Sequence, residues 1–97
     1  MPTYVTLANF TDQGVRTAKD TVKRAEAVKE LAKKHGVTVK DIYWTQGQYD
    51  IVTIADASDE MAATAFALSV GGMGNIRTQT LRAFSADEMK TVIGKMA

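Results

Sequence analysis

The stretch Trp44-Thr45-Gln46-Gly47-Gln48-Tyr49-Asp50 lies between two strand-like runs and determines the fold prediction. The residues before it, 42–45, are aromatic and β-branched, and those after it, 49–54, are β-branched and apolar, which is typical of strands. Gly47 tolerates the positive φ that tight hairpin loops require. The stretch therefore predicts a β-hairpin that presents polar and aromatic side chains at one end of a sheet: Trp44, Gln46, Tyr49 and Asp50.

The rest of the chain shows alternating strand and helix patterns. β-branched and aromatic runs predict strands at 3–10, 37–45, 49–57 and 75–83. Residues 11–19 are predicted to form a short helical segment or a turn. A helix is predicted at about 20–35 because Val22, Ala25, Val28, Leu31, Ala32 and His35 recur at spacings of three and four, and Gly36 supplies its end.

Two further helices are predicted in the second half of the chain. Ser58, a cap residue followed by two acids, begins a helix that is apolar nearly all round from Met61 to Val70. Such a helix is expected to be covered on more than one side. Ser85 and Glu88 form a capping-box pattern, which begins a terminal helix with an apolar stripe at Met89, Val92, Ile93 and Met96.

The predicted order is β-α-β-β-α-β-α, which indicates an α+β fold in a single domain, residues 1–97. Its first six elements predict a ferredoxin-like βαββαβ arrangement, with a four-stranded antiparallel sheet and both crossover helices on one face. The other face of the sheet stays open, because the terminal helix is too short to cover it. A small chain with an uncovered sheet is expected to form a homodimer, and further assembly is expected to involve Met61 and Phe66.

Composition limits the classes of function. The 97 residues include no cysteine, which excludes disulfides and thiolate chemistry, and one histidine. No metal site and no cofactor is expected from one histidine and scattered acids. No signal peptide and no membrane-spanning run is recognised, so a cytoplasmic protein is expected. Nucleic-acid binding is not expected, because the basic residues of 16–34 lack interleaved aromatic side chains.

Four segments of the chain resemble a known family. They are 1–5, 9–14, 43–50 and 74–84, and together they are similar to the GYD-domain proteins, named for the Gly-x-Tyr-Asp turn. The resemblance covers essentially the whole chain. It implies a ferredoxin-like domain of the dimeric α/β-barrel kind, in which two sheets meet through their open faces. It also implies a bacterial or archaeal source and no firmly assigned activity.

A second resemblance concerns the effector-binding domain of Lrp/AsnC regulators. Residues 47–50, Asp56 and residues 74–80 are similar to its Gly-x-Tyr-Asp hairpin and Gly-Val-x-x-Thr-x-Thr strand, which flank an amino-acid site at a subunit interface. Asn75-Ile76 replaces Gly-Val here by one register, and the 97 residues contain no recognisable helix-turn-helix. The resemblance implies effector binding and not transcriptional control by this chain alone.

The candidate chemistry centres on Asp50. Ser58 and Ser85 are assigned as helix caps, so no catalytic triad is predicted. Asp50, beside Trp44 and Tyr49, is either a general base or a structural acceptor for N–H groups of the turn. The first alternative is a cofactor-free monooxygenase or isomerase, by analogy with the barrel superfamily, and whether the chain is an enzyme stays open.

The preferred prediction is a pocket for a small organic metabolite, with an aromatic or carboxylate group, near the hairpin. Rings and hydroxyls from the strands and the turn are the candidate ligands for it. These ligand-binding residues are Tyr4, Thr6, Asn9, Trp44, Tyr49 and Asp50, with Thr78 and Thr80 as further candidates. A structural or protein-interaction module is the second alternative.

Overall fold

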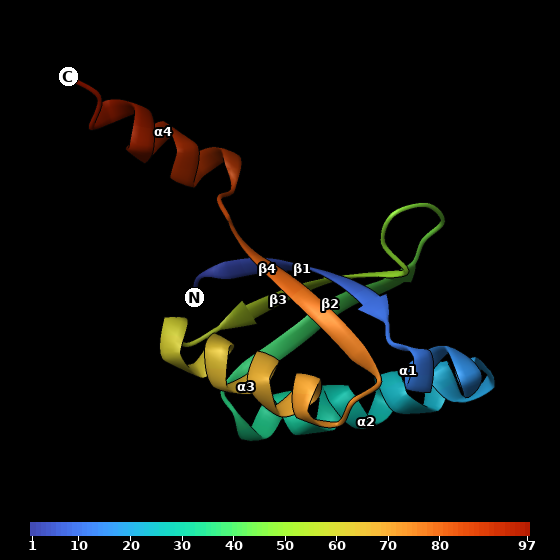
Figure 1. The fold of residues 1–97 in the computed structure, drawn as a ribbon. Helices are drawn as coiled ribbons and strands as arrows, with labels where there is room; N and C mark the ends of the chain where they lie inside the picture. Colours follow the sequence, from blue (N-terminus) through green and yellow to red (C-terminus); the bar gives the residue numbers. More distant parts are fainter.

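The computed structural model describes residues 1–97 and contains the predicted alternation of strands and helices (Figure 1). The strands are β1 (Thr3–Phe10), β2 (Val37–Trp44), β3 (Ile51–Ala57) and β4 (Ile76–Ala83). The helices are α1 (Asp12–Arg16), the 3₁₀ turn η1 (Ala18–Asp20), α2 (Thr21–Lys34), α3 (Glu60–Gly72) and α4 (Ala86–Gly94). The α+β, ferredoxin-like prediction is confirmed.

The four strands form one antiparallel sheet in the order β2-β3-β1-β4. Directly paired residues share a face of an antiparallel sheet. Thr6 pairs with Thr53 and Thr80, and these residues lie on the side of the helices. Val5 pairs with Ile54 and Leu81 on the opposite side. Alternate residues of β1 and β4 therefore lie on opposite faces of the sheet.

Helices α2 and α3 pack side by side on one face of the sheet (Figure 1). Asp59, and not Ser58 as predicted, caps α3, because its carboxylate accepts the N–H of Ala62 at 2.7 Å. Helix α2 ends before Gly36, which has the positive φ (72°) that favours glycine. Val22, the first residue of the helical spacing, is 58% exposed at the start of α2.

The interior of the chain is thinly packed. Only eight of the 97 residues are buried, and all of them except Tyr4 are small: Gly14, Ala8, Ala32, Val37, Ala55, Ala57 and Val70. The Cα radius of gyration is 14.5 Å, whereas a compact domain of this length has about 13 Å. The chain therefore leaves apolar surface that its own elements do not cover.

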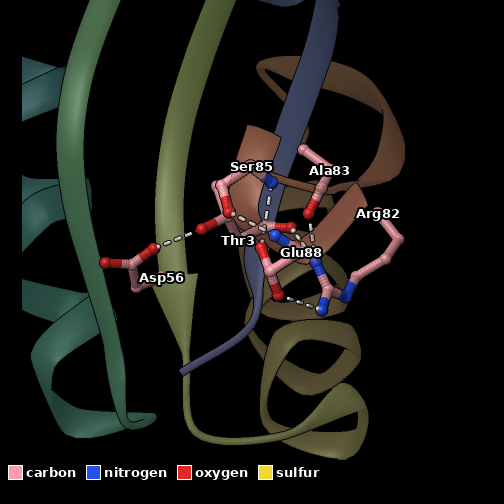
Figure 2. Close-up of polar contacts among 6 residues, drawn as sticks. All are labelled: Thr3, Asp56, Arg82, Ala83, Ser85 and Glu88. Atoms are coloured by element: carbon pink, nitrogen blue, oxygen red, sulfur yellow. Dashed lines mark hydrogen bonds and ion pairs between the residues drawn. The ribbon is translucent and has the colours of Figure 1, made fainter. Parts of the chain in front are cut away.

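Helix α4 projects away from the sheet and the other helices (Figure 1). Its first turn is fastened to β4, because Arg82 pairs with Glu88 at 3.3 Å and the Ser85–Glu88 capping box is formed (Figure 2). The predicted capping box is thus confirmed. The stripe of α4 is exposed, at Met89, Val92, Ile93 and Met96. The helix leaves the outer face of the sheet open, as predicted.

No helix of the chain combines the length and the apolar character needed to cross a membrane.

Candidate functional site

Two adjoining cavities lie between the sheet and the helices α2 and α3. The larger, of about 150 Å³, is lined mainly by hydrophobic residues of the sheet and the helices, including Trp44, and its polar lining residues are Thr21, Arg24, Thr53 and Asn75. The smaller, of about 70 Å³, lies nearer to Tyr4 and α3. Six residues line both cavities: Val28, Ile42, Ile51, Thr53, Val70 and Ile76. We call the two cavities together the chamber.

Tyr4 supplies the one unpartnered polar group of the interior. Its side chain is only 8% exposed, and its hydroxyl oxygen is buried without a hydrogen-bond partner. A buried hydroxyl left without a partner costs about 1–3 kcal/mol. No residue lining the cavity beside Tyr4 is charged. The hydroxyl is therefore a donor available to a neutral acceptor in this cavity.

A groove between α3 and β4 leads from the surface to Tyr4. Ala63, Ala67, Thr78 and Thr80 line both this groove and the cavity beside Tyr4. Arg82, at the same groove, stacks over the rings of Tyr4 and Phe84, with its guanidinium carbon 5.9 and 4.5 Å from the ring centres. The guanidinium also donates to the carbonyls of Thr3 and Ala83, so its hydrogen bonds are already engaged (Figure 2).

Five of the eight predicted ligand-binding residues line the chamber. Tyr4, Thr6, Thr78 and Thr80 lie around the smaller cavity, because alternate positions of β1 and β4 face the helices. Trp44 lines the larger cavity, and its indole N–H donates to the Thr21 hydroxyl at 3.0 Å.

The other three predicted residues lie outside the chamber. Asn9, Tyr49 and Asp50 line neither cavity. The Tyr49 hydroxyl donates instead to Gln79 at 3.0 Å, and Gln79 pairs with Leu7 on the open face of the sheet. The structure thus does not bring the hairpin residues and Tyr4 together.

Asp50 joins the hairpin to β1. Its carboxylate accepts the N–H of Phe10 at 2.9 Å, and its own N–H donates to the carbonyl of Ala8 at 2.9 Å. Its carbonyl accepts the N–H of Thr45, which closes the loop. Gly47 in this loop has a φ of 97°, as the hairpin prediction required. These contacts support the structural alternative for Asp50.

Three of the segments that carry the family resemblance, 9–14, 43–50 and 74–84, meet at this end of the sheet. Thr11 donates its hydroxyl to the carbonyl of Gly74, and Gln13 donates to Met73 and Asn75. Gly14 packs so closely on Asn75 that a Cβ at this position would lie 1.9 Å from the Asn75 carbonyl oxygen. We call Thr11, Gln13, Gly14, Gly74 and Asn75, together with Asp50, the motif lock. Sequence reasoning did not assign this structural role, although it named all the segments.

Helix α3 has an uncharged outer face. Met61 and Leu68 are 84% and 72% exposed, and Ala65 lies between them on the same face. No charged residue occurs in α3 after Glu60. Helix α2, by contrast, carries seven charged side chains between Lys23 and Lys34. The outer face of α3 therefore lacks the polar side that a solvent-exposed helix normally has.

Comparison with known proteins identifies the family of the chain. Residues 4–93 match the GYD domain model. The chain is 31% identical over 90 residues to a protein of Thermus thermophilus, and the match covers 92% of this chain and 95% of that protein. The Thermus protein is described as a glutamine synthetase and cystathionine beta-lyase binding protein. No solved structure matches significantly. The motif lock lies within the matched range, and the chain belongs to the GYD domain family.

Proposed function

We propose that this chain is a protein-binding module that docks on a partner protein through the outer face of α3. The observation that carries the proposal is the row of exposed apolar side chains on this helix, Met61, Ala65 and Leu68. Exposed apolar patches on small proteins mark interaction sites. The description of the Thermus relative as a binding protein for two enzymes supports the proposal. Glutamine synthetase and cystathionine beta-lyase are therefore the first partners to test.

The test is a binding measurement with the two purified enzymes from the source organism. Leu68→Asp places a charge on the proposed contact, and we expect it to weaken binding at least tenfold, as loss of a large apolar contact does. Val22→Asp is the matched control, because Val22 is an exposed apolar residue on α2. Equal binding by the wild type and Leu68→Asp would reject α3 as the contact, and lack of binding to both enzymes would reject these partners.

Self-association through the open face of the sheet belongs to the same proposal. Val5, Ile54 and Leu81 form one row on this face, and Leu7 and Val52 begin the next. Leu81 is 41% exposed, and Tyr43 beside Val52 is 57% exposed. A second copy that covers this face would remove these apolar side chains from water, at about 25 cal/mol for each Å² of area. We therefore infer a homodimer closed by the two sheets.

Sedimentation at micromolar concentration tests the dimer. We expect the wild type and the Val22→Asp control to sediment as dimers, and Leu81→Asp to sediment as a monomer. Leu81 lies on the edge strand β4 and is partly exposed, so the variant is expected to fold. A monomeric wild type would reject the proposed dimer and would not affect the proposal for α3.

Binding of a small organic metabolite is the second candidate function, and the chamber is the observation that favours it. Its position under α2 and α3 differs from the hairpin end that the sequence indicated. A cavity of about 150 Å³ in a chain of this size is large enough for a benzene-sized molecule. We place the candidate ligand between Tyr4, Thr6, Trp44, Thr78 and Thr80.

Fluorescence of Trp44, the only tryptophan, offers the screen for this candidate. A molecule that enters the chamber is expected to change the emission of Trp44 and to raise the melting temperature. If no compound of a metabolite library changes the Trp44 emission or the melting temperature, ligand binding in the chamber is rejected.

A further inference from the structure

We propose that the ligand of the chamber is a neutral carbonyl compound with an apolar body, held by a hydrogen bond from the Tyr4 hydroxyl. This inference rests on the second candidate function, binding of a small molecule in the chamber. It adds the chemical class of the ligand and the atom that recognises it.

The hydroxyl of Tyr4 identifies the polar end of the ligand. It is buried and has no partner within the protein, and buried polar groups are nearly always hydrogen-bonded. A phenol donates readily to a carbonyl oxygen. The other polar side chains of the same cavity are hydroxyls, those of Thr6, Thr53, Thr78 and Thr80. The ligand therefore needs one acceptor at the Tyr4 end.

The charge of the lining excludes a carboxylate from the Tyr4 end. The residues that line the smaller cavity include no lysine, arginine or histidine. Burial of a carboxylate without a cation is strongly unfavourable. Arg77 and Arg82 line the outer groove and not the smaller cavity, and the guanidinium of Arg82 is bound to Glu88 and to the carbonyls of Thr3 and Ala83. A neutral acceptor is thus favoured over the carboxylate that the sequence also allowed.

The apolar lining and the cavity sizes define the body of the ligand. Val28, Ile42, Ile51, Val70 and Ile76 line both cavities and offer no hydrogen bond from their side chains. The larger cavity has about 150 Å³ and the smaller about 70 Å³. A cavity of about 150 Å³ accommodates benzene, so an aromatic ring or a short alkyl chain of about six to ten non-hydrogen atoms fits.

The open groove between α3 and β4 is the route of entry. It reaches Tyr4 and shares Ala63, Ala67, Thr78 and Thr80 with the smaller cavity. Because these side chains are small, α3 would need to move only slightly to admit a flat molecule. A carbonyl that enters along this route meets the Tyr4 hydroxyl, while the apolar body continues towards Trp44.

Three probes of similar size test the class of ligand: ethylbenzene, acetophenone and benzoate. Their affinities for the wild type and for Tyr4→Phe are measured by NMR titration, following the methyl signals of Val70 and Ile76, which line both cavities. The quantity compared is the affinity ratio of acetophenone to ethylbenzene, because differences in hydrophobicity of the two probes cancel between the proteins. Benzoate is expected to bind at least tenfold more weakly than acetophenone.

We expect the affinity ratio to fall about three- to tenfold in Tyr4→Phe, which is the effect of one lost hydrogen bond. Ethylbenzene is expected to bind both proteins equally, which shows that the variant is folded and its chamber intact. An unchanged ratio, or benzoate as the tightest probe, would overturn the inference while ligand binding in the chamber stands. If no probe shifts the Val70 and Ile76 signals, both the inference and the second candidate function fail.

Discussion

The two ends of the sheet are stabilised in different ways. At the end of the motif lock, polar atoms are paired: Asp50 accepts from Phe10, Thr11 donates to Gly74, and Gln13 donates to Met73 and Asn75. At the end of Tyr4, the central hydroxyl has no partner, and the cavity beside it is lined by small and apolar side chains. The polar groups are paired at one end and unpaired at the other, although cavity space reaches both, because Phe10 and Asn75 line the larger cavity and Tyr4 lines the smaller.

This difference indicates that the Gly-Gln-Tyr-Asp turn, for which the family is named, stabilises the fold. The Gly-Gln-Tyr-Asp turn contributes Asp50 to the lock, and Tyr49 reaches the open face through its bond to Gln79. Tyr4 and Thr6, at the smaller cavity, come instead from strand positions with ordinary residue types. The Gly-Gln-Tyr-Asp turn and the cavity beside Tyr4 are therefore separate features of this fold. The following predictions test the comparison, from the largest expected effect to the smallest.

Gly14→Ala should break the motif lock most severely. The added Cβ would lie 1.9 Å from the carbonyl oxygen of Asn75, so the backbone of α1 or of the Gly74–Asn75 segment must move. We expect a loss of about 3 kcal/mol or more in the free energy of unfolding, measured in urea.

Gly71→Ala is the control for this substitution, because a Cβ at Gly71 in α3 meets no atom within 4 Å. Alanine is the better helix former, so this variant should be neutral or gain up to about 1 kcal/mol. If Gly14→Ala were as stable as Gly71→Ala, the close contact between α1 and Asn75 would be contradicted.

Asp50→Ala should remove the acceptor for Phe10 and cost about 1–3 kcal/mol in the free energy of unfolding. Asp50→Asn retains an oxygen that accepts the same N–H, so it should cost less than Asp50→Ala. Asp41→Ala, an exposed acid on β2, is the control and should change stability by less than about 0.5 kcal/mol. Equal stability of Asp50→Ala and Asp41→Ala would speak against the structural role of Asp50.

The fold was predictable because most of its signals are local. The capping box of Ser85 and Glu88 and the stop at Gly36 depend on a few neighbouring residues, and both formed as predicted. The cap of α3 was displaced by one residue, since Ser58 and Asp59 are both good caps and only the path of the chain selects Asp59. Val22 fits the helical spacing, but its side chain is 58% exposed, because spacing alone does not fix which side chains of a first helical turn are covered.

The grouping of the candidate site residues was predictable only in part. Tyr4, Thr6, Thr78 and Thr80 line one cavity, because alternation along a strand fixes which side chains share a face. Tyr49 and Asp50 lie in a loop, where no periodicity fixes the direction of a side chain, so their partners Gln79 and Phe10 were not foreseen. The missing partner of the Tyr4 hydroxyl depends on packing in three dimensions, and no sequence pattern reports it.

Tyr4→Phe should raise the free energy of unfolding, whereas the substitutions in the motif lock should lower it. Without ligand, it removes a buried hydroxyl that has no partner, so we expect a gain of about 1 kcal/mol in the free energy of unfolding. Tyr49→Phe is the control: it loses an exposed hydrogen bond to Gln79, and its effect should be a slight loss. If Tyr4→Phe instead loses as much stability as the removal of a hydrogen-bonded hydroxyl does, the Tyr4 hydroxyl has a partner. The polar groups at the two ends of the sheet would then be equally well paired.

Glu88→Gln should have the smallest effect, confined to α4 and to pH values above the pKa of Glu88. A hydrogen bond from the Ser85 backbone, followed by contacts with Arg82, lowers the pKa of Glu88 below its usual 4.5. Since the pKa is lower in the folded state, the stabilisation of α4 is present above about pH 4.5 and is lost as the pH falls through the folded-state value.

Amide hydrogen exchange in α4, compared between pH 7 and pH 3, measures this acid dependence. The wild type should lose protection in acid, and Glu88→Gln should show little further loss there, since it lacks the titrating group. Asp87→Asn, which alters a 95% exposed side chain in the same turn, should keep the acid dependence of the wild type. An unchanged acid response in Glu88→Gln would contradict the role of the Ser85–Glu88–Arg82 contacts in holding α4 at the Tyr4 end of the sheet.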